Sequence, residues 1–254
     1  MPRFGTLDVA PIATDLPDLS VLAGPEWELP DAEFLQINWE VDDEAALTLT
    51  PPSLHPSIPP FASFFGCRFP ESPVGAFTIV QVRLVVRAGI RPRALCLGAV
   101  CDSPEAVQAL RDHWGYPVQL GEVDVAHRHD QVRFTAALDG RMVVDLAVHT
   151  ADVINGNDLM TFDNLHLVRL GDDEGATLVQ VDPEYTIHQA DRGRPTVSLP
   201  DPHALGMAGS LRLVSPIIGF TFRADSDLVP VRFMIDSVKP AISSTKRVAQ
   251  PDAS

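Results

Sequence analysis

The sequence contains almost no lysine. Of its 19 basic residues two are lysine, Lys239 and Lys246, and the other 17 are arginine. The chain before Lys239 therefore has no primary amine side chain that could form a Schiff base. This absence disfavours pyridoxal-phosphate enzymes, lysine-dependent decarboxylases and phosphate loops that end in Gly-Lys-Ser.

Clustered positive charge is also missing. The formal net charge is −15, and no stretch of the chain gathers basic residues. A protein that neutralises phosphates needs such a cluster, so we expect neither a nucleic acid nor an anionic membrane as partner. Residues 1–5 lack the features of a secretory signal or a lipidation motif, and the longest apolar stretches are only strand-sized. We expect a cytoplasmic protein.

Cysteine is scarce, and no metal or cofactor motif is evident. Cys67, Cys96 and Cys101 stand at no metal-ligand spacing, and an odd number of thiols fits a reducing compartment. His127 and His129 alternate on a predicted strand, but without a third ligand we interpret them as a hydrated hairpin. Neither a Gly-x-Ser-x-Gly elbow nor a dinucleotide fingerprint occurs. We therefore expect no cofactor and no metal.

The length and composition favour one large domain. With 254 residues, of which 45% are hydrophobic, the chain can bury a sizeable core. We expect a domain over residues 31–238. An N-terminal arm (1–30), kept from forming a long helix by its prolines, precedes it, and a flexible polar tail (239–254) follows.

Strand patterns dominate the domain. Two helices are predicted, a short one after Asp42 and a second that starts at the Ser103 cap with Pro104 and runs to about His113. A proline-rich loop spans residues 51–60, and Asp139-Gly140 is a hairpin turn signal. Alternating or apolar segments predict strands at Phe34–Val41, Ala76–Arg87, Pro92–Val100, Gly121–Ala126, Gln131–Leu138, Arg141–Val148, Leu165–Leu170, Thr177–Val181, Thr186–Ala190 and Leu211–Phe222. Many antiparallel strands with few helices indicate an α+β protein, mainly antiparallel β.

The residues around the end of the second helix carry a family resemblance. The stretch from Arg111 to Gly121, Arg-Asp-His-Trp-Gly-Tyr-Pro-Val-Gln-Leu-Gly, resembles the signature of the acetoacetate decarboxylase family. Upstream, Gly75-Ala76-Phe77-Thr78 is similar to the start of a family strand, and the later strands follow in the expected order over roughly Leu35 to Val229. The resemblance implies a closed cone or barrel around an internal pocket, and assembly as a homo-oligomer.

The family's catalytic groups are absent at the matching positions. The Schiff-base lysine matches Val118, and the neighbouring lysine, which keeps the first uncharged, matches Gln119. The family's strand glutamate falls at or near Ile79, which carries no charge either. The resemblance therefore implies the fold without the family's iminium chemistry.

The signature loop lines the pocket in this family, which implies that Trp114, Tyr116, Val118 and Gln119 contact a ligand. A valine and an amide in place of two ammonium groups suit a larger and less charged ligand. Gln119 is the first candidate for a polar contact, although Trp114 and Tyr116 could equally be plain core aromatics. Arg111 matches the family arginine and is expected to hold the helix to the sheet or to meet substrate.

Three further groups are candidates for the pocket. Gln81 lies two residues after Ile79, hence on the same strand face, and could hold a ligand carbonyl. His113, at the helix end, could act as an acid or base, or could simply complement the helix dipole. Asp145 and His149 share a strand face and could couple as a general base, or could form an exposed polar face.

Three functions remain open. The first is a cofactor-independent enzyme, of secondary, polyketide-like metabolism, that promotes cyclisation, dehydration or isomerisation of an apolar small molecule. The second is a non-catalytic ligand-binding or regulatory relative. The third is a decarboxylase or lyase that uses His113 or the Asp145 and His149 pair.

Overall fold

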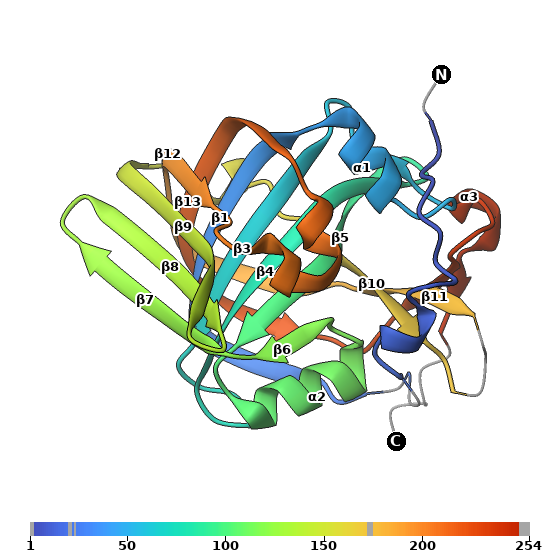
Figure 1. Ribbon diagram of the computed structural model, residues 1–254. Helices are drawn as coiled ribbons and strands as arrows, with labels where there is room; N and C mark the ends of the chain where they lie inside the picture. The colour runs from blue at the N-terminus through green and yellow to red at the C-terminus, as the bar shows by residue number, and fades with distance from the viewer. Residues whose placement is uncertain (1–2, 20–21, 23, 172–174, 249–254) are drawn as a thin grey trace.

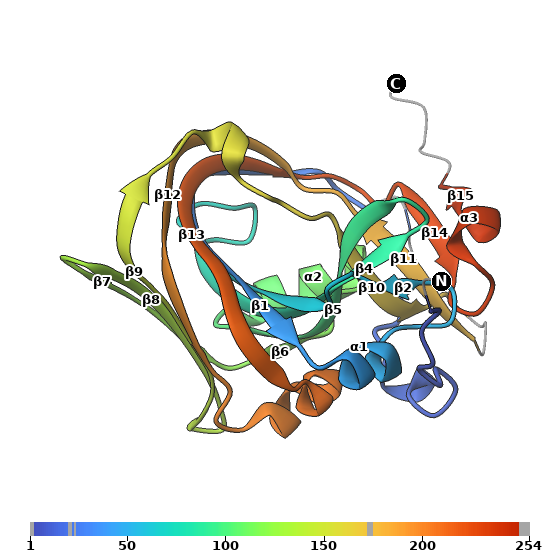
Figure 2. The ribbon, with the colours of Figure 1, turned by 90° about the horizontal axis from the view of Figure 1, so that it is seen from above.

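In the computed structural model, which describes residues 3–19, 22, 24–171 and 175–248, one large sheet curls around the core (Figures 1 and 2). The helical segments are η1 (Ala13–Asp15), α1 (Asp43–Leu49), α2 (Pro104–Trp114), η2 (Gly156–Asp158), η3 (Pro202–Ser210) and α3 (Ala241–Ser244). The strands are β1 (Trp27–Val41), β2 (His55–Pro56), β3 (Phe61–Phe69), β4 (Phe77–Ala88), β5 (Arg91–Cys101), β6 (Val118–Leu120), β7 (Glu122–Arg128), β8 (Gln131–Leu138), β9 (Arg141–Val153), β10 (Asn164–Arg169), β11 (Ala176–Val181), β12 (Glu184–Ser198), β13 (Leu213–Leu228), β14 (Phe233–Asp236) and β15 (Lys246–Arg247).

The α+β class predicted from the sequence is confirmed, but the sheet is not closed by hydrogen bonds. Its strand order is β15-β14-β11-β10-β5-β4-β3-β1-β13-β12-β9-β8-β7, so within the described residues β15 and β7 are its two edges. The two ends lie on opposite sides of the molecule in both views (Figures 1 and 2). Side-chain packing, not backbone hydrogen bonding, holds the β8 and β9 end of the sheet against its middle strands. Phe134 of β8 and Leu146 of β9 pack into one core with Leu35, Phe64 and Val82.

Helix α2 is delimited as its sequence predicts. The Ser103 side chain accepts a hydrogen bond from the Ala106 amide, Pro104 occupies the first turn, and Gly115 ends the helix in the left-handed conformation at φ 66°. These are the usual start and stop residues of a helix. The helix leads directly into Tyr116 and the short strand β6, which pairs with β5 in parallel.

A bulge in β1 sets which residues face inward. Leu29 and Phe34 are both buried although they are five residues apart, whereas side chains in a regular strand alternate between two faces. The pairing of β1 with β13 shifts register between Leu29 and Ala32, and Asp31 there has a positive φ of 50°. The extra residue restores the inward orientation on both sides of the bulge.

The described residues near both chain ends pack on the rest of the protein. Gly5, Thr6 and Leu7 donate backbone hydrogen bonds to carbonyls of residues 47–54, in α1 and the loop after it. Residues 239–248, expected as the start of a flexible tail, instead carry α3 and β15, and Val248 is buried. The rest of the expected tail, residues 249–254, lies outside the described residues. No described helix is long and apolar enough to cross a membrane.

Candidate functional site

A cavity lies inside the curled sheet, close to the end of α2. Its wall is mainly aromatic and aliphatic: Phe34, Phe65, Phe69, Phe77, Tyr185, Leu29, Ile79, Leu110 and Leu228. The polar groups in the wall are Cys67, Gln81, Tyr116, Asn164 and Ser226, and none of the described lining residues is charged. The strands β1, β3, β4, β10 and β13 and the end of α2 thus all contribute to one space.

The cavity is small because aromatic rings fill it. Phe34 stacks on Phe222 with ring centroids 4.6 Å apart, and Tyr185 meets Phe34 edge-on at 5.4 Å. The remaining volume is about 30 Å³, which is room for very few water molecules. The larger ligand expected from the sequence does not fit this space as it stands. Only a small ligand enters without displacing a ring.

Tyr116 is the cavity residue with the most defined polar environment. Its hydroxyl oxygen accepts a hydrogen bond from the Asn164 side-chain amide at 3.3 Å, and the Asn164 carbonyl oxygen accepts one from the Arg83 guanidinium at 3.0 Å. Burial raises the pKa of the Tyr116 phenol far above its usual value, so the group stays protonated. Its O–H is therefore a hydrogen-bond donor at the cavity wall.

His166 lies beneath Tyr116 and is neutral. Its ring is tilted by 51° to the Tyr116 ring with centroids 4.0 Å apart, and its Nδ1 lies 2.7 Å from the Trp114 carbonyl oxygen. Since a carbonyl only accepts, Nδ1 carries the proton and the buried Nε2, which has no partner among the described residues, holds a lone pair. Burial lowers the pKa of His166 to about 4, so the imidazole is uncharged at neutral pH.

Three of the residues predicted from the sequence come together at the cavity: Ile79, Gln81 and Tyr116. Gln81 is 3% exposed, and its Oε1 has no hydrogen-bond partner in the described structure. Ile79 and Gln81 share the inward face of β4, as their two-residue spacing predicts. The apolar Ile79 stands in the wall where the resemblance implies a glutamate.

Four residues of the signature stretch lie outside the cavity lining. Gln119 is exposed on β6 and donates to the Ala204 carbonyl at 2.9 Å, so it has no contact with the cavity. Val118 is fully buried in the core beside the cavity. Trp114 is a core aromatic whose Nε1 donates to the Val229 carbonyl at 2.8 Å. Arg111 donates to the Val118 carbonyl at 3.2 Å and so holds α2 to β6.

The acid and base candidates predicted from the sequence are not brought together. Asp145 forms a two-point ion pair with Arg133 across the strands, at 2.7 and 2.6 Å. His149 is too far from Asp145 to couple to it, because four residues along a strand span about 13 Å. Its Nε2 instead lies 3.3 Å from the Thr196 hydroxyl. His113 is half-buried at the C-terminus of α2, where it contacts Trp114. None of the three lines the cavity.

The sequence reasoning missed Arg83, Asn164, His166 and Tyr185. Arg83 stands between Val82 and Leu84, and His166 stands between Leu165 and Leu167. A polar residue between apolar neighbours in a strand is the signal that could have identified these two. Arg83 and Asn164 come together only because β10 pairs in parallel with β5, next to β4. No group of three metal-ligating side chains is found among the described residues.

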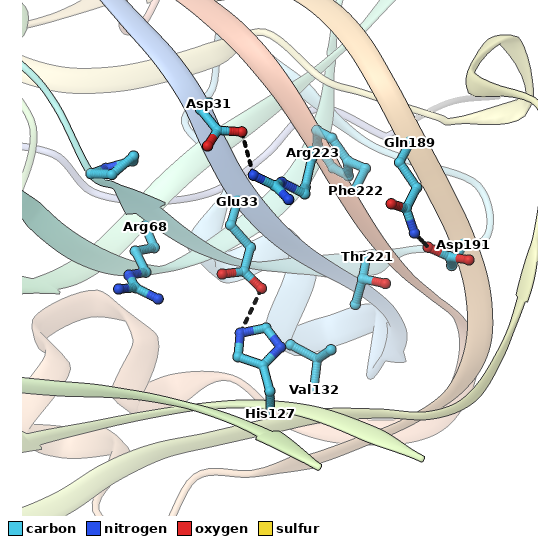
Figure 3. Close-up of a pocket in the computed structure, with 11 residues that line it drawn as sticks. Asp31, Glu33, Arg68, His127, Val132, Gln189, Asp191, Thr221, Phe222 and Arg223 are labelled. Carbon is cyan, nitrogen blue, oxygen red and sulfur yellow. Dashed lines mark hydrogen bonds and ion pairs between the residues drawn. The ribbon is translucent and has the colours of Figure 1, made fainter. Parts of the chain in front are cut away.

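A second hollow, called the outer hollow below, lies on the opposite face of the same sheet, between the sheet and the hairpin of β7 and β8 (Figure 3). Its volume is about 490 Å³. Here the polar side chains pair with one another: His127 lies 2.8 Å from Glu33, Arg223 pairs with Asp31, and Gln189 donates to Asp191 at 2.9 Å. Arg68 also lines this hollow, which is open to solvent.

Comparison with solved structures supports the fold. An acetoacetate decarboxylase from Legionella pneumophila has a TM-score of 0.73 and 17% identity, over 82% of this chain and 86% of that one. The enduracididine biosynthesis enzyme MppR complexed with pyruvate has a TM-score of 0.67 and 19% identity, over 82% and 90%. An acetoacetate decarboxylase-like enzyme from Sphingomonas wittichii RW1 has a TM-score of 0.64 and 16% identity, over 81% and 90%.

The sequence itself identifies the family. A comparison with curated proteins finds no match. The family model described as acetoacetate decarboxylase, in contrast, matches residues 16–234, which is most of the chain and includes α2, β6 and every strand of the cavity wall. This protein therefore belongs to the acetoacetate decarboxylase family.

Proposed function

We propose that this protein is a cofactor-independent enzyme that binds a small carbonyl compound in the internal cavity and promotes its enolisation. The observation that carries the proposal is the Tyr116 hydroxyl. It stays protonated and accepts from Asn164, which leaves its O–H free to donate, and Tyr116 lines a cavity with a mainly apolar wall. A donor in such an environment polarises a carbonyl and stabilises the developing enolate, while the proton of the adjacent carbon passes to a water molecule in the cavity, because no described lining residue is charged and could accept it.

The family's covalent route is not available to this chain. The first lysine is Lys239, and its side chain is 77% exposed on the outside of the protein. Val118, which matches the Schiff-base lysine, is fully buried. Isomerisation, dehydration and cyclisation of a carbonyl compound can each proceed through an enol, and we propose the reaction among these three. The similarity to MppR, an enzyme of enduracididine biosynthesis, supports a place in secondary metabolism.

A second candidate function is ligand binding without catalysis. The small volume of the cavity favours it, because about 30 Å³ leaves little space for a reacting molecule. The third possibility, a decarboxylase that uses His113 or the Asp145 and His149 pair, has no support from the geometry, since these side chains lie outside the cavity lining.

Deuterium exchange tests the proposed function. We expect the wild-type protein to accelerate exchange of the hydrogens next to the carbonyl of acetone, pyruvate or acetoacetate in D₂O, followed by NMR. Tyr116→Phe should slow this exchange by about 10²-fold or more, because it removes the donor to the enolate. Tyr185→Phe removes the other tyrosine hydroxyl at the same cavity, which has no hydrogen bond to Asn164, and should cost less than about tenfold.

The outcome separates the two candidates. Binding of these ketones without any acceleration of exchange would identify a non-catalytic relative. Equal losses in the two tyrosine variants would show that Tyr116 has no special role.

Borohydride reduction tests the absence of an iminium. With acetoacetate and sodium borohydride, we expect the intact mass of the protein to stay unchanged, because no buried lysine is present to form an adduct. A mass increase that survives replacement of Lys239 and Lys246 by arginine would contradict the assignment.

A further inference from the structure

A buried cation lies directly behind the wall of the cavity. Arg83 is on β4, two residues after Gln81, and is 1% exposed. Its guanidinium donates to the Ser63 hydroxyl and to the Asn164 carbonyl oxygen, each at 3.0 Å, and lies 4.0 Å from the centre of the Phe65 ring. Because Asn164 and Phe65 both line the cavity, the charge is one side chain away from it.

This cation has no counter-ion in the described part of the chain. Its hydrogen-bond partners are neutral, and no described carboxylate forms an ion pair with it. The thiols and phenols near it stay protonated at pH 7, because burial raises the pKa of each. An arginine keeps its proton even when buried, and an unpaired buried charge is costly. A residue that costs stability in this way indicates a role other than stability.

Arg83 fixes the orientation of the Asn164 amide. A guanidinium has donors and no acceptor, so the Asn164 carbonyl oxygen must face Arg83, and the amide nitrogen then faces the Tyr116 hydroxyl oxygen, 3.3 Å away. Tyr116 is therefore the acceptor in this bond, and its own proton is left for another partner. With an apolar side chain at position 83, the amide could turn over and accept the Tyr116 proton itself.

The charge of Arg83 also distinguishes a ketone from its enolate. The ketone is neutral, whereas negative charge develops on its oxygen as the C–H bond beside the carbonyl breaks. In the low dielectric of the interior, a cation that reaches this oxygen through Asn164 and Tyr116 stabilises the enolate more than the ketone. An interaction that strengthens only as the reaction proceeds raises the rate and leaves ground-state binding almost unchanged.

We propose that Arg83 is a positioning residue for the enolisation: through Asn164 it keeps the Tyr116 proton available to the ligand, and its charge stabilises the enolate that forms. In this step the electron pair of the broken C–H bond becomes the enolate, the proton passes to a water molecule in the cavity, and Arg83 neither gains nor loses a proton. The inference rests on the proposed function for the reaction, and it adds a residue that does not itself line the cavity.

The deuterium-exchange assay separates this role from a purely structural one. Arg83→Met should lower the maximal rate of exchange on acetone by about 10²-fold, while the acetone concentration that gives half of this rate stays the same. Arg83→Lys keeps a charged donor and should recover most of the rate. Arg87→Met is the matched control, because it removes an exposed arginine from the same strand and should change neither quantity. A change confined to the half-maximal concentration, or a loss of rate that Arg83→Lys does not recover, would overturn the inference.

A double variant tests whether Arg83 acts through Tyr116. In a Tyr116→Phe background, Arg83→Met should slow exchange little further, since the donor that Arg83 positions is already gone. If Arg83→Met does not fold, Asn164→Asp breaks the same connection without a change of size, because an aspartate cannot donate to Tyr116 but still pairs with Arg83. Fully additive losses in the double variant, or an Asn164→Asp protein that is as fast as the wild type, would contradict the proposal.

Tyr116 can also be observed without catalysis, because the chain has two tyrosines and Tyr185→Phe removes the other one. In this background, with tyrosine labelled by ¹³C at the ring carbon that bears the hydroxyl, acetone should shift the single NMR resonance, since the hydroxyl then donates to the ketone. Arg83→Met should abolish this response, because Asn164 has taken the proton, and Arg87→Met should preserve it. A response that persists in Arg83→Met would show that Arg83 does not orient the hydroxyl.

The two proposals fail in different ways. Exchange that is slowed by Tyr116→Phe but not by Arg83→Met would support the enzyme and overturn the role of Arg83. Absence of exchange in the wild type would overturn the enzyme, and the NMR response alone would then decide whether Arg83 orients Tyr116.

Discussion

The internal cavity and the outer hollow are two faces of the same strands. Phe34 of β1 is opposite Cys67 of β3 and Phe222 of β13, and this row faces the inside. The adjacent residue Glu33 is opposite Arg68 and Arg223, and this second row lines the outer hollow.

The two faces differ in how their charged side chains are paired. On the outside, carboxylates and basic groups pair with one another near water (Figure 3). Inside, the one cation near the cavity, Arg83, is surrounded by neutral groups in the described structure. Most charged groups of the hollow thus pair within the protein, although Arg68 forms no ion pair in the described structure, whereas Arg83 beside the cavity has only neutral hydrogen-bond partners there.

The largest expected effect is a difference in the free energy of unfolding between variants of two neighbouring residues, one on each face. Phe34→Ala should lower the free energy of unfolding by about 3–5 kcal/mol, because it removes a ring that packs against Phe65, Phe222 and Tyr185. Glu33→Ala should cost less than about 1 kcal/mol, because its ion pair is partly exposed. Guanidinium denaturation measures both, and similar losses would show that the two faces are not energetically distinct.

An intermediate effect is expected from His166 on acidification. Its folded-state pKa of about 4 lies below the ordinary value of 6.5, so the unfolded chain binds the proton first as the pH falls. Its contribution to stability is therefore complete above about pH 6.5 and is lost between pH 6.5 and 4, by roughly 2 kcal/mol at pH 5.

Variants isolate this contribution. In His166→Gln the decrease in stability between pH 7 and pH 5 should be smaller than in the wild type, as measured by urea denaturation. His203→Gln replaces an exposed histidine and serves as the control. If both variants lose stability on acidification as the wild type does, His166 is not the titrating group.

The smallest effect is expected in the outer hollow. His127→Ala should change the free energy of unfolding by less than about 1 kcal/mol, because the imidazole is half exposed and the pair with Glu33 is ionic only when His127 is protonated. At 1 M NaCl the difference should vanish, since salt screens exposed pairs. A cost that persists in high salt, measured by thermal unfolding at pH 6, would indicate that the hollow is less open than described.

Local signals in the sequence were sufficient to predict helix α2 and most of the strands. The Ser103 cap, Pro104 and Gly115 specify α2 to within one residue of its observed bounds, and Gln131–Leu138 was predicted with the bounds of β8. Strands β12 and β13 extend well beyond the predicted segments, because their added residues alternate between exposed and covered positions and show no apolar run. Local periodicity could not predict that the sheet stays open.

The candidate site was predictable only in part. Tyr116, Ile79 and Gln81 followed from the family resemblance and from strand alternation. Arg83 has a local signal, since it stands between Val82 and Leu84, but its contacts with Ser63 and with Asn164, 81 positions away along the chain, could not be predicted. Gln119 was expected inside on the same resemblance, yet the short parallel strand β6 presents it to the surface.

The bulge in β1 has a consequence for how this chain can change in evolution. The Asp31 amide donates to the Asp225 carboxylate at 2.9 Å, and Arg223 pairs with the Asp31 side chain, so the extra residue is fixed to the neighbouring strand. Loss of this single codon would reverse the orientation of every residue between Trp27 and Leu29, and Leu29 would leave the cavity for solvent. Relatives that keep this cavity should therefore tolerate substitutions at position 31 but not deletions.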